Sequence, residues 1–327
     1  MAGQASAARQ IETEGYGPLG RSQWMDVDWR AQQRWVRVDG RPLNVIEIGS
    51  GPVVVFLHGL AGCWQNWLET IPEIARDHRV IALDLPGFGA SPMPAQPITM
   101  PGYARMLDEL FVTLGVDSAT LVGSSMGGFV AAEFAIRYGA QVQRLCLTSP
   151  AGLSMEHMRN ERNQGPRARI ENVLFFGTGW LASKSDRVVR SERLRRALLM
   201  LVAAHPERLP SRLVVEQARG AGKPGFNDAL DAMTGYPIRD RLGEIDCPVL
   251  IVWGELDRLV PVRDAGEFEW LIPRARRIIY ADTGHLVMLE RPARFNADLR
   301  AFLDEDAGPR TPWPDQRTLS NPGSPDR

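Results

Sequence analysis

The chain has 327 residues, of which 44% are hydrophobic and 24% are charged, and its formal net charge is −1 at pH 7. Such a chain can form one large or two modest globular domains, and its charge excludes a global field that would attract nucleic acid or an anionic membrane. The three cysteines, Cys63, Cys146 and Cys247, are too widely spaced to indicate a disulfide framework or a metal site.

Residues 1–10 lack the apolar stretch of a signal peptide, and the sequence contains no apolar run of about 18 residues that would span a membrane. We therefore expect no integral membrane segment and a cytoplasmic location. Residues 1–32 are predicted to form an N-terminal arm, with tryptophans at 24 and 29. The sequence leaves open whether this arm packs on the domain or on a partner.

The core begins with two short alternating runs, 34–38 and 43–48, which are separated by Asp39-Gly40-Arg41-Pro42. Alternation around such turn residues predicts a hairpin. Apolar runs then alternate with helical segments in 33–149 and again in 238–303, which predicts a mostly parallel sheet covered by helices on both faces. The further strands are expected at 53–57, 80–84, 119–122, 142–148, 249–253 and 277–280, and the helices at 67–76, 103–114, 265–271 and 292–302.

Between these two parts, residues 150–237 contain no convincing strand and are predicted to form a helical lid, with helices at 193–204 and 213–219. An insertion above the carboxyl ends of sheet strands lies where such folds bind ligands. From Glu156 to Arg241 there are 16 basic and 10 acidic residues, which fits either transient contact with lipid headgroups or a solvated surface. Residues 304–327 mix Pro, Asp, Arg and Ser without periodicity and are predicted to be disordered.

The most informative motif is Gly123-Ser124-Ser125-Met126-Gly127, between the apolar run 119–122 and a helical segment. Only Ser125 has glycine two residues before it and two residues after it. This order predicts a strand, a tight turn and a helix that lift the Ser125 hydroxyl above the sheet beside a helix N-terminus. Ser125 is therefore a candidate nucleophile, and the alternative is a turn serine that caps the helix.

A serine nucleophile needs a base within hydrogen-bond reach and an acid that orients the base. Asp257 follows the predicted strand at 249–253, and His285 follows the strand at 277–280. The order Ser, Asp, His is the one found in α/β-hydrolase folds. Other carboxylates that could serve as the acid are Glu255, Asp264 and Asp282.

Four motifs together resemble the α/β-hydrolase superfamily over about residues 33–303, and in particular its esterases and monoacylglycerol-lipase-like enzymes. They are His58-Gly59, the serine motif 123–128, the run 254–261 around Asp257, and Gly284-His285 followed by Glu290-Arg291-Pro292. The resemblance implies a mostly parallel eight-stranded sheet with a helical lid. It also implies Ser125 as nucleophile, Asp257 as acid and His285 as base.

The same resemblance places the oxyanion hole at the backbone N–H groups of Leu60 and Met126. It implies no cofactor and no metal. His58 is expected to brace the oxyanion loop rather than carry protons. The sequence does not indicate an oligomeric state.

Serine with an oxyanion hole suits attack on a carbonyl carbon, so the expected substrate is a small-molecule carboxylic ester with a small or medium apolar acyl group. The serine motif also resembles the C–C bond hydrolases of aromatic meta-cleavage pathways. Those enzymes usually carry Asn, a second serine and Trp where this chain has Ser124, Leu60-Ala61 and Leu286. A third alternative is a non-catalytic ligand-binding member of the fold, which the complete set of three residues disfavours.

Overall fold

A computed structural model describes residues 15–154, 191, 193, 199–220 and 222–306. The predicted eight-stranded sheet is confirmed, with the order β1-β2-β4-β3-β5-β6-β7-β8. Strand β2 pairs antiparallel with both of its neighbours, and every other pairing is parallel. The strands are β1 Gln33–Val38, β2 Arg41–Ile48, β3 Val53–Leu57, β4 Arg79–Leu83, β5 Ala119–Ser124, β6 Val142–Thr148, β7 Val249–Gly254 and β8 Ala275–Tyr280.

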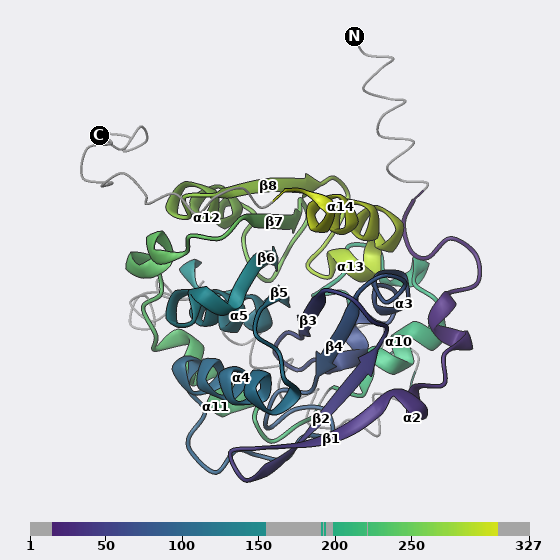
Figure 1. Ribbon diagram of the computed structural model, residues 1–327. Helices are drawn as coiled ribbons and strands as arrows, with labels where there is room; N and C mark the ends of the chain where they lie inside the picture. The colour runs from purple at the N-terminus through teal and green to yellow at the C-terminus, as the bar shows by residue number, and fades with distance from the viewer. Residues whose placement is uncertain (1–14, 155–190, 192, 194–198, 221, 307–327) are drawn as a thin grey trace, which may run out of the picture.

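Helices cover both faces of this sheet (Figure 1). One face carries α4, α5 and α12, and the other carries α3, α13 and α14. The described α-helices are α2 Trp29–Gln32, α3 Ile71–Ile74, α4 Met100–Leu114, α5 Met126–Arg137, α10 Ser211–Ala218, α11 Phe226–Thr234, α12 Arg263–Leu271, α13 Val287–Glu290 and α14 Pro292–Asp304. Short 3₁₀ turns cover Gln23–Asp26, Trp64–Trp67, Gly139–Gln141, Pro206–Arg208 and Arg239–Glu244.

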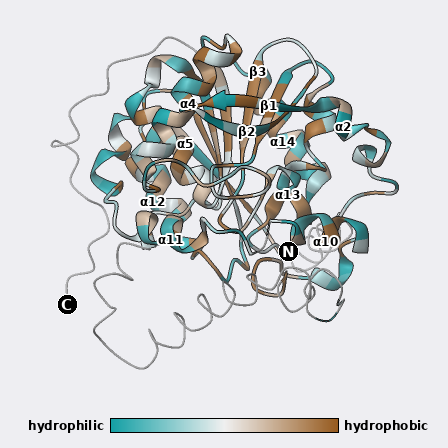
Figure 2. Cartoon of the chain, turned by 90° about the horizontal axis from the view of Figure 1, so that it is seen from below, coloured by the Kyte–Doolittle hydropathy of each residue, from teal (hydrophilic) through white to brown (hydrophobic). Residues whose placement is uncertain are grey.

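The central strands are apolar on both sides, as the continuous runs in the sequence predict. In β3, Val55 and Leu57 pack under α4 and α5, whereas Val54 and Phe56 pack under α3 and α14. Figure 2 shows these strands largely brown between helices whose ribbons are partly teal. Burial on both faces fixes the central strands, so the side chains at their carboxyl ends project from a rigid edge.

The N-terminal arm packs on the domain from Gly15 onward, which answers the question that the sequence leaves open for these residues. Trp24 joins the core beside α3 and α14, and the Trp29 ring lies 4.9 Å from that of Trp64. Ser22 Oγ and Trp24 Nε1 both donate to Oε1 of Glu69, at 2.7 and 2.8 Å. Residues 1–14 lie outside the described part of the chain, as do residues 307–327 of the predicted tail.

Two predicted helices differ from the structure by more than a shift of one to three residues at their ends. The segment 67–76 is divided into a 3₁₀ turn at Trp64–Trp67 and the four-residue helix α3. Pro72 lacks the N–H that one continuous helix would need at that position, so the segment cannot form a single helix. The predicted helix 193–204 ends at Leu199, and 194–198 lie outside the described residues. After Leu199 the chain turns, and Val202 and Ala204 bond to a distant loop instead.

About half of the predicted lid, including 155–190, lies outside the described residues. Helices α10 and α11 from its second half pack on loops at the carboxyl edge of the sheet. Gln217 accepts from Asn66 Nδ2 at 2.6 Å and donates to the Gln65 carbonyl at 2.9 Å, and Gly225 N donates to Gly87 O at 3.0 Å. Within the described part of the chain, no helix is both long and apolar enough to cross a membrane.

Candidate active site

Ser125 lies at the tip of a strained turn between β5 and α5. Its backbone angles are φ 52° and ψ −116°, a region that non-glycine residues rarely adopt. The turn is so tight that a Cβ on Gly123 would overlap the backbone of Gly127. Hydrogen bonds from Ser125 N to Thr148 O, at 3.0 Å, and from Ala151 N to Ser125 O, at 3.1 Å, hold the strained residue in place.

The loop after β3 lies directly against this turn. A Cβ on Gly59 would lie 3.1 Å from Ser125 Cβ and 3.8 Å from its Oγ. A Cβ on Gly127 would overlap the carbonyl oxygens of Leu57 and His58. Glycine at both positions therefore allows the backbone of Gly59 and Leu60 to approach the serine side chain.

The structure brings Asp257 and His285 together. Nδ1 of His285 lies 2.7 Å from Oδ2 of Asp257, and both side chains are almost completely buried. The other oxygen of Asp257, Oδ1, accepts from Leu259 N at 2.9 Å and Val260 N at 3.0 Å. The carboxylate is thus fixed by backbone donors, and it orients the imidazole through Nδ1.

The other carboxylates considered as the acid have different partners. Asp264 Oδ2 accepts from Ser154 Oγ at 2.5 Å, and Asp282 Oδ1 lies 2.7 Å from Nε2 of His205. Glu255 Oε2 accepts from the backbone N–H of Asp282 at 3.3 Å. Among the described residues, Asp257 is the carboxylate that contacts His285.

The second ring nitrogen of His285, Nε2, is buried and has no hydrogen-bond partner within the described residues. Ser125 and His285 both follow the carboxyl ends of strands in the same parallel set, β5 and β8. No hydrogen bond joins the two side chains in the described structure, and such bonds often tighten only when substrate binds. A general base needs a ring nitrogen without a hydrogen-bond partner at this edge of the sheet, and Nε2 is such an atom.

Two backbone donors flank the serine. Within the described part of the chain, the N–H groups of Leu60 and Met126 have no hydrogen-bond acceptor. Met126 is the first residue of α5, so its N–H also lies at the positive end of the helix dipole. N–H groups without an acceptor beside a nucleophile are the donors that an oxyanion hole requires.

His58 braces the loop that carries Leu60. Its Nδ1 donates to Gly59 O at 2.8 Å, and its Nε2 accepts from Leu85 N at 2.9 Å, so both ring nitrogens are engaged. Burial lowers the pKa of His58, which favours the neutral ring that these two bonds require. This geometry agrees with the bracing role expected from the sequence.

Sequence reasoning missed the residues that hold the loop around His285. The backbone N–H groups of His285 and Leu286 donate to Val202 O at 3.0 and 3.1 Å. Glu290, which is fully buried, accepts from Gly284 N at 2.8 Å and from Tyr16 Oη at 2.7 Å. Burial raises the pKa of Glu290, and the hydrogen bonds that it accepts oppose this effect. The Glu290-Arg291-Pro292 motif marked the position, but nothing in the sequence paired it with Tyr16.

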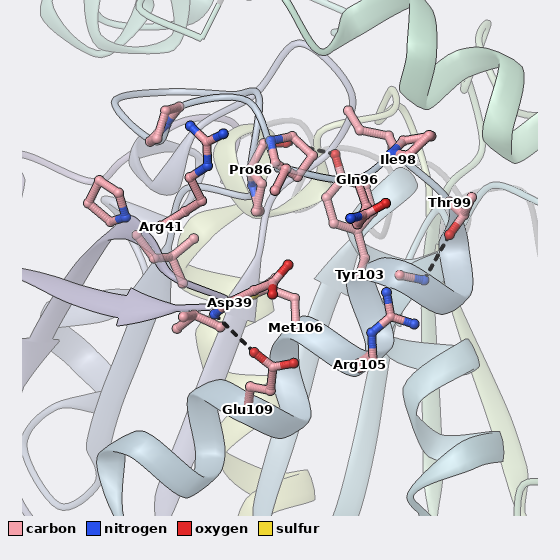
Figure 3. A pocket seen from close by; sticks show the side chains of 18 residues that line it. Asp39, Arg41, Pro86, Gln96, Ile98, Thr99, Tyr103, Arg105, Met106 and Glu109 are labelled. Atoms are coloured by element: carbon pink, nitrogen blue, oxygen red, sulfur yellow. Dashed lines mark hydrogen bonds between the residues drawn. The ribbon is translucent and has the colours of Figure 1, made fainter.

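A separate hollow of about 600 Å³, including its opening to solvent, lies between the β1–β2 turn and the start of α4 (Figure 3). Its walls include Arg41, Pro86, Tyr103 and Arg105, and none of the three candidate catalytic residues lines it. The described residues contain no group of three or more His, Cys, Asp or Glu side chains arranged to hold a metal ion.

Comparison with known proteins identifies the family of the chain. The model of the alpha/beta hydrolase fold matches residues 52–292. The 2-hydroxy-6-oxo-6-phenylhexa-2,4-dienoate hydrolase of Comamonas testosteroni is 29% identical over 273 residues, which cover 79% of this chain and 89% of that protein.

Among solved structures, a bacterial membrane phospholipase A is 27% identical with a TM-score of 0.66, covering 93% of this chain and 91% of the other. A thermophilic esterase from Thermogutta terrifontis, at 24% identity and a TM-score of 0.65 over 83% of this chain and 98% of its own, shares the fold. Because the family match covers more than half of the sequence, the chain belongs to the alpha/beta hydrolase fold family.

Proposed function

We propose that the protein is a serine hydrolase that cleaves a carboxylic ester with a small or medium apolar acyl group. Ser125 is the nucleophile, His285 the general base and Asp257 the acid that orients the base. The observation that carries this proposal is the buried Asp257–His285 hydrogen bond of 2.7 Å at the sheet edge that also presents the strained Ser125.

In this mechanism Ser125 Oγ attacks the ester carbonyl while Nε2 of His285 accepts the hydroxyl proton. Asp257 keeps Nε2 free of a proton beforehand, because the imidazole N–H is held on Nδ1 by the carboxylate. The oxyanion that forms accepts from the N–H groups of Leu60 and Met126, and one such donor is worth about 10² to 10³ in rate. His285 then protonates the leaving alcohol, and water hydrolyses the acyl-enzyme by the same route.

Three positions favour ester cleavage over C–C bond cleavage. The meta-cleavage hydrolases that the chain resembles usually carry Asn before the nucleophile, and here Ser124 is buried with no partner for its Oγ among the described residues. They also use a second serine hydroxyl in the oxyanion loop, where this chain has Leu60 and Ala61. The Trp expected after the base is Leu286.

C–C bond hydrolysis is the second candidate, and one observation favours it. The dienoate hydrolase of Comamonas testosteroni is similar to this chain along most of its length. A substrate of that kind also presents a carbonyl carbon to a serine or an activated water, so the same three residues would serve. The choice between the two reactions is therefore made by the residues around the carbonyl, not by the fold.

The test is hydrolysis of p-nitrophenyl esters from acetate to palmitate by the wild-type protein and by Ser125→Ala. We expect wild-type turnover with an optimum at short or medium chains, and a loss of about 10⁶-fold in Ser125→Ala. A folded wild-type protein that hydrolyses no ester but cleaves a phenyl-substituted dienoate would replace the ester proposal with the C–C reaction. Binding of either compound without turnover would indicate a non-catalytic member of the fold.

A further inference from the structure

We propose that Tyr16 of the N-terminal arm is a positioning residue for His285. This inference rests on the proposed function, in which His285 is the base, and adds a residue that lies outside the family motifs. Tyr16 is buried although it precedes the first strand by 17 residues. Its ring packs against the segment after Leu199 and its hydroxyl reaches the loop that carries His285.

The Tyr16 hydroxyl connects three parts of the chain. It donates to Oε2 of Glu290 at 2.7 Å and accepts from the backbone N–H of His205 at 2.9 Å. The next residue, Gly17, donates its N–H to the Glu290 carbonyl at 2.6 Å. The arm is therefore attached to both the side chain and the backbone of Glu290.

Glu290 also accepts hydrogen bonds from the residues on either side of His285. Its Oε2 also accepts from Gly284 N at 2.8 Å, and its Oε1 accepts from Leu286 N at 3.2 Å. A further bond of 2.8 Å from Ala204 N to Oε2 brings in the segment after Leu199. The two amides that flank His285 thus share one buried carboxylate with Tyr16.

The segment after Leu199 holds the same loop from its other side. Val202 O accepts from the N–H groups of both His285 and Leu286. Tyr16 fixes the register of this segment through the bond from His205 N, while the His205 side chain bonds to Asp282. Removing the Tyr16 hydroxyl therefore loosens both supports of the loop at once.

The expected consequence is a small displacement of the imidazole, not unfolding. Tyr16→Phe keeps the ring, with the Arg208 and Arg291 guanidinium carbons 4.8 and 5.0 Å from its centroid. It leaves His205 N and one lone pair of the buried Glu290 without their partner, and such groups relax toward new ones. A misplacement of about 1 Å at a catalytic group can lower a rate by about 10²-fold.

A matched control is available in the same arm. Ser22 Oγ donates to Oε1 of the half-buried Glu69 at 2.7 Å, the same kind of anchor at a different place. Ser22→Ala removes one hydroxyl and one bond to a carboxylate, whereas Tyr16→Phe also removes the acceptor of His205 N. No hydrogen bond described for Ser22 reaches the loop around His285. A general loosening of the arm would affect both variants equally.

The experiment uses diethyl p-nitrophenyl phosphate with the full-length protein. Ser125 Oγ forms a bond to phosphorus, p-nitrophenolate leaves with the electron pair of the broken P–O bond, and the serine proton passes to His285. The end-point counts competent sites, and the rate constant reports base-assisted attack. We expect Tyr16→Phe to react on the order of tenfold more slowly at an unchanged end-point, with Ser22→Ala equal to wild type.

With a p-nitrophenyl ester, the same variant should show a lower kcat at an unchanged KM. Glu290→Gln provides a second variant, because its amide nitrogen cannot accept from Leu286 N, and it should react more slowly as well. An unchanged rate in Tyr16→Phe, an equal decrease in Ser22→Ala, or a lower end-point at an unchanged rate would each overturn the proposal. The last of these results would show that Tyr16 only stabilises the fold.

Hydrogen exchange separates this proposal from the proposed function. If the wild type releases no p-nitrophenol, or Ser125→Ala releases it equally, the serine mechanism fails, and the exchange of the Gly284, His285 and Leu286 amides still tests the role of Tyr16. Faster exchange of this peptide in Tyr16→Phe than in Ser22→Ala would support positioning of the loop by Tyr16. Equal exchange in both variants would overturn it.

Discussion

The turn that carries Ser125 and the loop that carries His285 lie at the same edge of the sheet but are held differently. Ser125 is fixed mainly by residues close to it in sequence and by the two strands beside β5. The loop around His285 depends on contacts from Tyr16, Val202 and Ala204, which lie 80 to 270 residues away in the chain.

This difference assigns different tasks to the two regions. The serine turn stores strain within a rigid strand, turn and helix, so it holds the proposed nucleophile mainly through residues close to it in sequence. The histidine loop is held by the arm and by the segment after Leu199, so its geometry depends on both. We infer that the proposed base is the more adjustable half of the site.

The largest expected effect on turnover comes from removing the candidate side chain in each of the two regions. Ser125→Ala and His285→Ala should each lower kcat for a p-nitrophenyl ester by about 10⁶-fold, and the double variant should lose about the same. Residues that act as one unit are non-additive, because attack by the serine requires the base. Steady-state kinetics of the three variants checks this.

If the double variant loses much more than either single variant, the two residues act independently and the shared mechanism is wrong. Thermal unfolding of each variant provides the control. Ser125→Ala should not lower the unfolding midpoint, since it removes only a hydroxyl from a strained residue that its backbone bonds hold.

The orientation of the base is the next largest effect. Asp257→Asn should leave the fold intact and lower kcat by about 10⁴-fold, because an amide donor opposite Nδ1 stabilises the wrong imidazole tautomer. Asp264→Asn is the matched control, since Asp264 is also buried but bonds to Ser154. Loss of turnover in Asp264→Asn with normal turnover in Asp257→Asn would transfer the acid role to Asp264.

Local patterns in the sequence predict the sheet, and together with the family resemblance they indicate the candidate triad. Apolar runs and turn residues predicted all eight strands, and the Gly-x-Ser-x-Gly spacing predicted a turn that Ser125 indeed occupies with a positive φ. The resemblance to the α/β-hydrolase superfamily favours Asp257 over its rivals, and Asp257 is the one bonded to His285.

The supports of the histidine loop could not be predicted in the same way. The bond between Tyr16 and Glu290 joins residues 274 apart, and no periodicity or spacing in one sequence encodes such a pair. The helix expected at 193–204 was wrong at its end for the same reason. Val202 and Ala204 have adequate helix propensity, but tertiary hydrogen bonds to the loop override it.

A methyl group added where the backbone approaches the serine turn should have a smaller effect on kcat. A Cβ in Gly59→Ala would lie 3.1 Å from Ser125 Cβ, so one of the two must move by a few tenths of an ångström. We expect kcat to fall on the order of tenfold to 10²-fold with little change in the unfolding midpoint. In Gly139→Ala the nearest atom would be 3.7 Å away, and that control should be unaffected.

Equal kinetics in Gly59→Ala and wild type would show that the serine turn is less rigid than its hydrogen bonds indicate. That outcome would remove the main difference between the two regions. A large fall in the unfolding midpoint instead would show that the new methyl group disrupts the core below the turn rather than the serine side chain.

The smallest expected effect concerns the two carboxylates that anchor the arm, Glu69 and Glu290. Burial raises the pKa of Glu69 despite the hydrogen bonds from Ser22 and Trp24. A carboxyl group with a raised pKa in the folded state favours folding while it is protonated, and this contribution is lost as the pH rises through that pKa. Gln at position 69 does not titrate, and its oxygen can accept both bonds, since both reach Oε1.

Glu69→Gln should therefore unfold at the same temperature as wild type near pH 4 and on the order of 1–2 °C higher near pH 7. Glu290→Gln should instead unfold at a lower temperature than wild type near pH 7, although burial raises the pKa of Glu290 as well. Donors reach both of its oxygens, from Gly284 on Oε2 and from Leu286 on Oε1, so an amide nitrogen must face an N–H group on one side. Thermal unfolding from pH 4 to 8 compares the two, and a higher midpoint for Glu290→Gln at neutral pH would mean that its hydrogen bonds do not hold the histidine loop.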